Sequence, residues 1–183
     1  VEEGSFWFGH RNRCIASLVT AFPPPEQGAI FDVGGGNGFV ALGLHRAGFE
    51  VVLVEPGRAG CLNARRRGLP HVVCATTETA DFRPASLPAI GLFDVVEHVA
   101  DDVAFLASLR ALLRPGGRVY LSVPAYRWLW SGEDVAAGHF RRYTRAELVG
   151  RLGVAGFEVE FATYFIRWLP LPIFLLRRVP HAL

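Results

Sequence analysis

The residues best placed to do chemistry lie in a glycine-rich run from Asp32 to Gly38, with the order Asp-Val-Gly-Gly-Gly-Asn-Gly. A short apolar run, 29–33, leads into it, and a segment with helical character, 39–47, follows it. Glycine has no Cβ, so its backbone can turn tightly and approach a ligand, while the next helix offers unpaired N–H donors. We therefore predict a strand, a ligand-binding loop and a helix.

The glycine spacing separates two classes of cofactor. A dinucleotide fingerprint requires Gly-x-Gly-x-x-Gly/Ala, and counting from Gly34 places Phe39 at the third glycine position. Glu55 follows a second apolar run, 50–54, and an acid at such a strand end can accept hydrogen bonds from both ribose hydroxyls. The alternative interpretation is that Glu55 is an ordinary exposed acid at a strand end. Because NAD enzymes also place an acid here, Glu55 alone does not decide which cofactor binds.

The elements that must position these residues alternate along the chain. The pattern predicts helices over 39–47, 58–67 and 101–113, between strands over 29–33, 50–54, 71–74, 89–93 and 118–123. Such alternation predicts an α/β fold with a doubly wound, mainly parallel sheet and helices on both faces. After the sheet, the residues Thr-Arg-Ala-Glu from Thr144 predict a capped helix, and Phe157 to Phe165 predicts another strand.

Composition bounds the class of protein. With 183 residues and 51% hydrophobic content, we expect a single domain: a helical lead-in (1–25), a cofactor-binding core (26–125) and a substrate-side cover with the C-terminal tail (126–183). The net charge of +2 shows no broad basic field, so no nucleic-acid partner is expected. Three cysteines without paired spacing favour reduced thiols and a cytoplasmic protein. The apolar segment from Phe165 to Leu176 is too short to span a bilayer but suits peripheral membrane contact.

Three motifs together resemble those of class I S-adenosylmethionine-dependent methyltransferases, of the ubiquinone- and menaquinone-biosynthesis type. They are the Asp-x-Gly-x-Gly-x-Gly run and the segments Phe93 to Val99 and Leu112 to Arg118. The resemblance covers Glu2 through Trp168 and implies a Rossmann-like methyltransferase fold. That class usually closes its sheet with a seventh, antiparallel strand, which we do not find, so the last strand is missing or unrecognisable and a sheet edge is left exposed.

The resemblance implies S-adenosyl-L-methionine as cofactor and methyl transfer to a small-molecule or lipid-like acceptor, through an O-, C- or N-nucleophile. The cofactor-binding residues it implies are Asp32, Gly34, Gly35, Gly36, Gly38, Glu55, Pro56, Thr76 and Asp94. Pro56 and Thr76 are expected beside the adenine, where Thr76 stands near the position of an acid in many relatives. The segments around Arg11 and from Gly138 to Thr144 also resemble one subgroup, as covers of the substrate and the methionine end of the cofactor.

His98 and His139 are the candidate catalytic bases, because a histidine takes up a proton near neutral pH. A structural or surface role is the alternative for both. Glu97, His98, Asp101 and Asp102 also suggest a divalent metal, but adjacent side chains on a helix diverge, so we expect no metal. Two other functional classes stay open: an NAD(P)-type oxidoreductase, and a non-catalytic module that binds S-adenosylmethionine.

Overall fold

The computed structural model describes residues 6–165 and contains a five-stranded, entirely parallel sheet in the order β3-β2-β1-β4-β5. The strands are β1 (Ile30–Val33), β2 (Val51–Val54), β3 (His71–Val73), β4 (Leu87–Phe93) and β5 (Leu113–Ser122). The predicted α/β fold with a doubly wound parallel sheet is confirmed. The strand order reverses between β1 and β4, and ligands of open α/β sheets bind at such a reversal.

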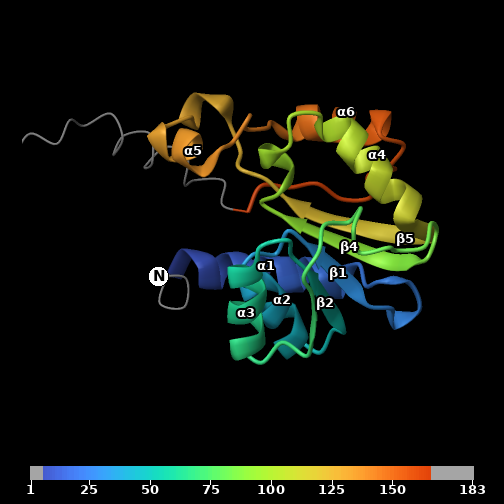
Figure 1. The fold of residues 1–183 in the computed structure, drawn as a ribbon. Coiled ribbons are helices and arrows are strands. Elements are labelled where there is room, and N and C mark those ends of the chain that lie inside the picture. The colour runs from blue at the N-terminus through green and yellow to red at the C-terminus, as the bar shows by residue number, and fades with distance from the viewer. Residues whose placement is uncertain (1–5, 166–183) are drawn as a thin grey trace, which may run out of the picture.

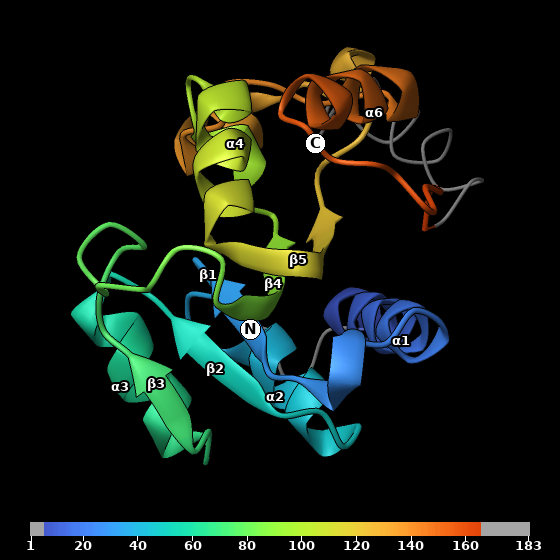
Figure 2. The same ribbon diagram turned by 90° about the vertical axis from the view of Figure 1, so that its right-hand side faces the viewer.

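Helices cover both faces of the sheet, with α1 to α3 on one side and α4 and α6 on the other (Figures 1 and 2). The helices are α1 (Phe6–Ala21), α2 (Phe39–Arg46), α3 (Arg58–Arg66), α4 (Asp102–Leu112), α5 (Gly132–Ala137) and α6 (Arg145–Val154), with short 3-10 turns η1 (Pro25–Gln27), η2 (Val96–His98) and η3 (Arg127–Leu129). The helices predicted over 39–47, 58–67 and 101–113 are confirmed to within one residue at each end, whereas β5 begins five residues before the predicted residue 118.

The core consists of two apolar layers, one on each face of the sheet. On the first face, Ile15 and Val19 of α1 and Leu44 of α2 pack against the sheet. On the second face, Leu106 and Leu109 of α4 and Leu152 of α6 do the same. Central parallel strands are covered on both sides, which explains why β4 is apolar along most of its length.

The capped helix predicted from Thr144 is confirmed as α6. The Thr144 hydroxyl accepts a hydrogen bond from the Glu147 amide at 3.3 Å, and the Glu147 carboxylate accepts one from the Thr144 amide at 2.7 Å. These reciprocal bonds satisfy donors that a helix N-terminus would otherwise leave unpaired.

The strand predicted over Phe157 to Phe165 is wrong. Its alternating apolar residues fit a strand, but a strand needs a backbone partner, and among residues 6–165 none pairs with this segment. Side chains hold it in place instead, through an Arg118–Glu160 ion pair at 3.0 Å and contact between the rings of Phe22 and Phe161. The outer edge of β5 is likewise unpaired within the described residues, in line with a sheet that lacks its last strand.

Candidate active site

The residues predicted to bind a cofactor gather at the carboxyl edge of the sheet. The glycine loop follows β1, Glu55 and Pro56 follow β2, Thr76 follows β3, and Asp94 follows β4. Parallel strands end at the same edge, so the fold brings together residues that are up to 62 positions apart, from Asp32 to Asp94.

The glycine loop adopts a backbone that only glycine accepts easily. Gly34, Gly36 and Gly38 have φ values of 71°, 54° and 73°, in the left-handed region. A Cβ at Gly38 would lie 2.5 Å from the Leu69 side chain, whereas one at Gly36 would meet nothing within 4 Å. The loop is therefore packed tightly against the protein at Gly38 and open at Gly36, the side from which a ligand can approach.

Glu55 ties this loop to the next one. One carboxylate oxygen accepts the Gly36 amide at 2.9 Å, and the other accepts the Gly57 amide at 2.6 Å. Each carboxylate oxygen has a second lone pair, so both can also accept a hydroxyl. The carboxylate lies where a group that binds the ribose is expected. It also holds the glycine loop and the loop after β2 together, and we call these two loops the cradle.

Asp32 lies beneath the loop. Its side chain is 0% exposed, and a Cβ at Gly35 would come within 2.5 Å of one carboxyl oxygen. Among the described residues, neither oxygen completes a hydrogen bond. Burial raises the pKa of Asp32 to about 7, although Arg11 and the Ala41 amide oppose the rise. The structure thus places Asp32 under the loop as a support.

On the side predicted for adenine, Pro56 and Thr76 are both exposed at the sheet edge. The Thr76 hydroxyl accepts the Thr79 amide at 3.3 Å, closing a local turn after β3. These two positions border the same open edge, and their contact with a cofactor stays a prediction.

Asp94, the first residue after β4, has an unusual backbone conformation, with a φ of 58°. Its carboxylate forms an ion pair with Arg11 of α1 at 2.9 Å and accepts the Ser122 hydroxyl at 2.9 Å. Neither Arg11 nor Ser122 was predicted individually to form the site. The resemblance pointed to the segment around Arg11, but the rotation of α1 that turns this side chain inward is not visible in the sequence.

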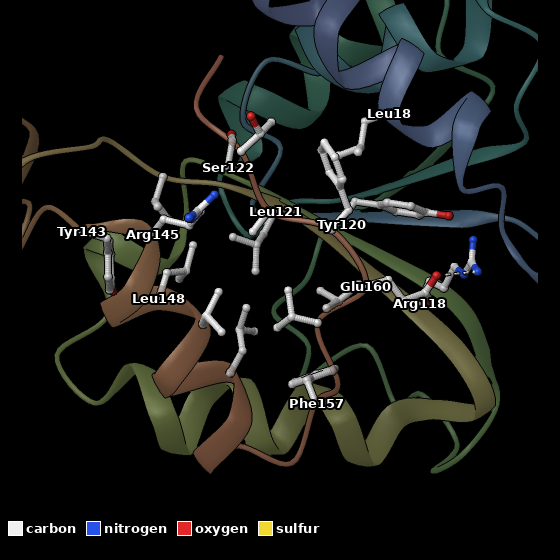
Figure 3. A pocket seen from close by; sticks show the side chains of 18 of the residues that line it. Leu18, Arg118, Tyr120, Leu121, Ser122, Tyr143, Arg145, Leu148, Phe157 and Glu160 are labelled. Carbon is white, nitrogen blue, oxygen red and sulfur yellow. Dashed lines mark hydrogen bonds and ion pairs between the residues drawn. The ribbon is translucent and has the colours of Figure 1, made fainter. Parts of the chain in front are cut away.

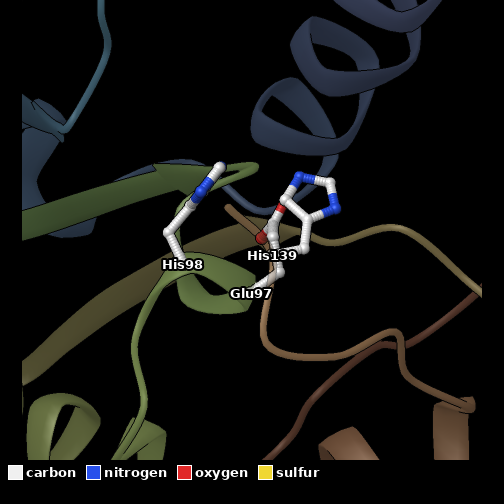
Figure 4. A group of neighbouring side chains, drawn as sticks. All are labelled: Glu97, His98 and His139. Atoms are coloured by element: carbon white, nitrogen blue, oxygen red, sulfur yellow. The ribbon is translucent and has the colours of Figure 1, made fainter. Parts of the chain in front are cut away.

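The two histidine candidates lie side by side. The rings of His98 and His139 are 4.7 Å apart at an angle of 77°, next to the buried Glu97 (Figure 4). His139 Nδ1 lies 2.9 Å from a carboxylate oxygen of Asp134, which also accepts Arg142 Nε at 2.7 Å. Burial tends to raise the pKa of Asp134, but the bonds from Arg142 and His139 outweigh it and hold the pKa at about 2. Burial and the neighbouring His139 lower the pKa of His98.

A cavity of about 1030 Å³ begins beside this group and extends between β5 and the segment 156–165. Asp94, Glu97 and His139 are among the residues that line it. Farther along, the lining is mostly apolar, and Leu121, Leu148 and Phe157 point into it (Figure 3). Sequence reasoning did not identify this cavity, because its walls come from several segments that are distant along the chain.

The chain is similar in sequence to known methyltransferases. Residues 7–161 match the sequence profile of the family described as "Methyltransferase domain". A ubiquinone biosynthesis O-methyltransferase from Xylella fastidiosa is 31% identical over 105 residues, which are 54% of this chain and 43% of that protein. The protein of the same name from Xanthomonas axonopodis pv. citri is 26% identical over 161 residues, which are 78% of this chain and 67% of that protein. The matched part of the chain therefore spans only 43% to 67% of the length of these relatives.

Solved structures show the same fold. A SAM-dependent methyltransferase from Leishmania major superposes with a TM-score of 0.66 at 20% identity, covering 87% of this chain and 67% of that one. Another SAM-dependent methyltransferase, from Aquifex aeolicus, superposes with a TM-score of 0.62 at 17% identity. The match covers 80% of this chain and 81% of that one. Since the family profile matches most of the chain, including the glycine loop and the sheet edge described above, the chain belongs to the methyltransferase-domain family.

Proposed function

We propose that the chain binds S-adenosylmethionine along the carboxyl edge of the sheet and transfers its methyl group to a small-molecule or lipid-like acceptor. The observation that carries this proposal is the cradle at the strand reversal, where the Glu55 carboxylate joins the amides of Gly36 and Gly57. Membership of the methyltransferase-domain family supports it.

The residues present fit this cofactor. The open side of Gly36 leaves room for a ligand, and the Glu55 oxygens keep lone pairs for the ribose hydroxyls. Pro56 and Thr76 border the adenine end, and Asp94 borders the methionine end. When bound, the cofactor supplies an electrophilic methyl group on a sulfonium.

The contribution of the chain is to orient the acceptor and to exclude water. The Arg11–Asp94 ion pair and Ser122 fix the end of the cavity that adjoins the cofactor edge. If the acceptor is a hydroxyl, His98 or His139 can take its proton. The lowered pKa of His98 favours a neutral ring, and Asp134 bound to Nδ1 of His139 leaves Nε2 free to accept.

The apolar cavity beside His139 suits a small apolar or lipid-like acceptor. The two relatives named as ubiquinone biosynthesis O-methyltransferases support a hydroxyl acceptor. The apolar C-terminal segment expected to contact a membrane lies almost entirely outside the described residues. No helix within residues 6–165 is both long and apolar enough to cross a bilayer.

The remaining assignments are part of the same proposal. Cys14, Cys61 and Cys74 are all unpaired thiols, which supports a cytoplasmic location. The division into lead-in, core and cover follows the order of elements around a single sheet, which supports one methyltransferase domain.

The test is calorimetry of this chain with S-adenosylmethionine, S-adenosylhomocysteine and, as a control, NAD. We expect micromolar binding of the first two, about −8 kcal/mol, and none of NAD. Binding of NAD alone would favour the oxidoreductase. Binding of S-adenosylmethionine without methyl transfer to any hydroxyl, amine or carbon acceptor would favour the non-catalytic module. Failure of a folded sample to bind either sulfur compound would overturn the proposal.

A further inference from the structure

Two of the three cysteines lie on either side of the same residue of the cradle. Cys61 belongs to α3, and its thiol donates a hydrogen bond to the Glu55 carbonyl at 3.1 Å. Cys74 is the first residue after β3. Strands β2 and β3 are parallel with Val54 opposite Val73, and the Glu55 amide donates to the Val73 carbonyl at 3.0 Å. The next residues along these two strands are Glu55 and Cys74, so both cysteines adjoin Glu55.

The two thiols point toward each other from neighbouring elements. Side chains alternate along a strand, and Val73 packs in the layer of the second face while Val72 packs in the layer of the first. Cys74 continues on the side of Val72, and α3 lies against β3 on that side (Figure 2). Burial, the adjoining Cys74 thiol and the charge of Glu55 raise the pKa of the Cys61 thiol to about 11. The two thiols therefore interact, and Cys61 stays protonated at neutral pH.

The two thiols differ in their access to solvent. Cys61 is 2% exposed, whereas Cys74 is an exposed residue. An oxidant in solution therefore reaches Cys74 first. An exposed thiol that is oxidised to a sulfenic acid condenses with a second thiol beside it and forms a disulfide. Cys74 has the exposure of the first thiol, and Cys61 has the position of the second.

Helix α3, which carries Cys61, is packed directly against the glycine loop. A Cβ at Gly60 would lie 2.7 Å from the carbonyl oxygen of Gly36. The Asn63 side-chain amide also donates a hydrogen bond to the side-chain oxygen of Asn37 in that loop, at 2.9 Å. A displacement of α3 at Cys61 is therefore transmitted to the loop.

We propose that Cys61 and Cys74 are a modification site, where a peroxide forms a reversible disulfide that weakens cofactor binding to the cradle. The Cys74 sulfur attacks one oxygen of hydrogen peroxide, the O–O bond breaks, and the products are a sulfenic acid and water. The Cys61 sulfur then displaces the sulfenic hydroxyl, which leaves as water with the Cys61 proton, and the S–S bond forms. The two sulfurs lose two electrons, which reduce the peroxide to two waters. A dithiol reverses the reaction by exchange.

The disulfide changes the cradle in two ways. The Cys61 sulfur loses its hydrogen, so the bond to the Glu55 carbonyl is lost. The S–S bond also brings the sulfurs to about 2.05 Å, which draws α3 toward the loop after β3. Through Gly60 this movement reaches Gly36, whose amide is held by the Glu55 carboxylate. The effect on the cofactor rests on the proposed function, whereas formation of the disulfide does not.

The first test maps the disulfide in the whole chain. The reduced chain is treated with hydrogen peroxide, the remaining thiols are blocked, and the chain is cut with trypsin. Cleavage after arginine leaves Cys14, Cys61 and Cys74 in three different peptides. We expect mass spectrometry to find the Cys61 and Cys74 peptides joined to each other and Cys14 blocked as a free thiol. Dithiothreitol should return both joined cysteines to thiols.

The second test measures S-adenosylmethionine binding by calorimetry after the peroxide has been removed. We expect the oxidised chain to bind at least about tenfold more weakly than the reduced chain, and dithiothreitol to restore the affinity. Cys74→Ser changes an exposed residue, should form no disulfide and should keep its affinity after peroxide treatment. Cys14→Ser is the matched control on α1 and should respond to peroxide as wild type does.

Circular dichroism verifies that the oxidised chain and both variants are folded. Peroxide treatment that leaves Cys61 and Cys74 unjoined, or converts Cys74 alone to a sulfinic acid, would overturn the proposal. So would unchanged affinity in the fully joined chain, or an equal loss of affinity in peroxide-treated Cys74→Ser. Failure of the reduced chain to bind S-adenosylmethionine would count against the proposed function instead, because the peptide map tests the disulfide without the cofactor.

Discussion

The proposed cofactor edge and the proposed acceptor side of the molecule are built in different ways. The cofactor edge consists largely of backbone: three left-handed glycines and two amides gathered by one carboxylate. The acceptor side consists of side chains that meet from distant segments, such as Asp134 with His139 and Arg142, and Asp102 with Tyr143. Substitutions should therefore affect ligand binding on the first side and local stability on the second.

The largest expected effect is on the cofactor edge. Gly36→Val should abolish measurable S-adenosylmethionine binding, because the new side chain would fill the open side of the loop at a φ of 54°. Gly48→Val is the matched control, since Gly48 also has a positive φ, of 94°, with nothing within 4 Å, but lies away from the site. Calorimetry should show binding in the control, and equal loss in both variants would mean that backbone strain, not occupation of the site, is responsible.

The next effect tests the acceptor side. Asp134→Asn should lower the free energy of unfolding by about 2–3 kcal/mol, because it leaves the mostly buried Arg142 without its charge partner. Urea denaturation measures the loss. S-adenosylmethionine affinity should stay within about threefold of wild type, a change of under 1 kcal/mol. An equal loss of cofactor binding would show that the two sides are not independent.

A third, smaller effect depends on pH. The folded chain keeps the Asp32 proton up to about pH 7, whereas the unfolded chain releases it near 3.8. The folded state binds more protons in this window, so the free energy of unfolding falls as pH rises through it. Asp32→Asn should remove that fall, a difference on the order of 1 kcal/mol or more between the two ends of the window. Urea denaturation across the window measures it, with the exposed Asp81→Asn as control; identical pH profiles for wild type and Asp32→Asn would contradict the assignment.

The smallest effect concerns the cap of α6. Thr144→Ala should cost about 1 kcal/mol of stability, since it removes the side-chain acceptor for the Glu147 amide. Thr144→Ser keeps that acceptor and should retain most of the stability in thermal melts. If alanine and serine behave alike, the cap contributes little and α6 is held by the packing of Leu152.

Sequence predicted the fold and the position of the glycine loop well, because both depend on local patterns. Alternating apolar runs gave the parallel sheet, and the run from Asp32 to Gly38 marked the loop at the strand reversal. The failure at Phe157 to Phe165 has a physical cause: alternation describes two faces of a segment and does not supply a backbone partner.

The acceptor side was predicted only in part. His98 and His139 were both identified, but their contact was not, since 40 residues separate them and no local pattern records it. Arg11 and Ser122, which hold Asp94, were missed for the same reason. The roles of the individual cofactor and catalytic residues stay predictions.

The segments that bring His98 and His139 together are also joined by their backbones, since the Phe140 amide donates a hydrogen bond to the Glu97 carbonyl at 2.8 Å. This bond links the segment after β4, which borders the cofactor edge, to the cover over the acceptor cavity. A ligand that immobilises one segment lowers the entropy that the second ligand must lose to immobilise the other. Coupling of this kind is reciprocal, so cofactor and acceptor should each raise the affinity of the chain for the other by the same factor.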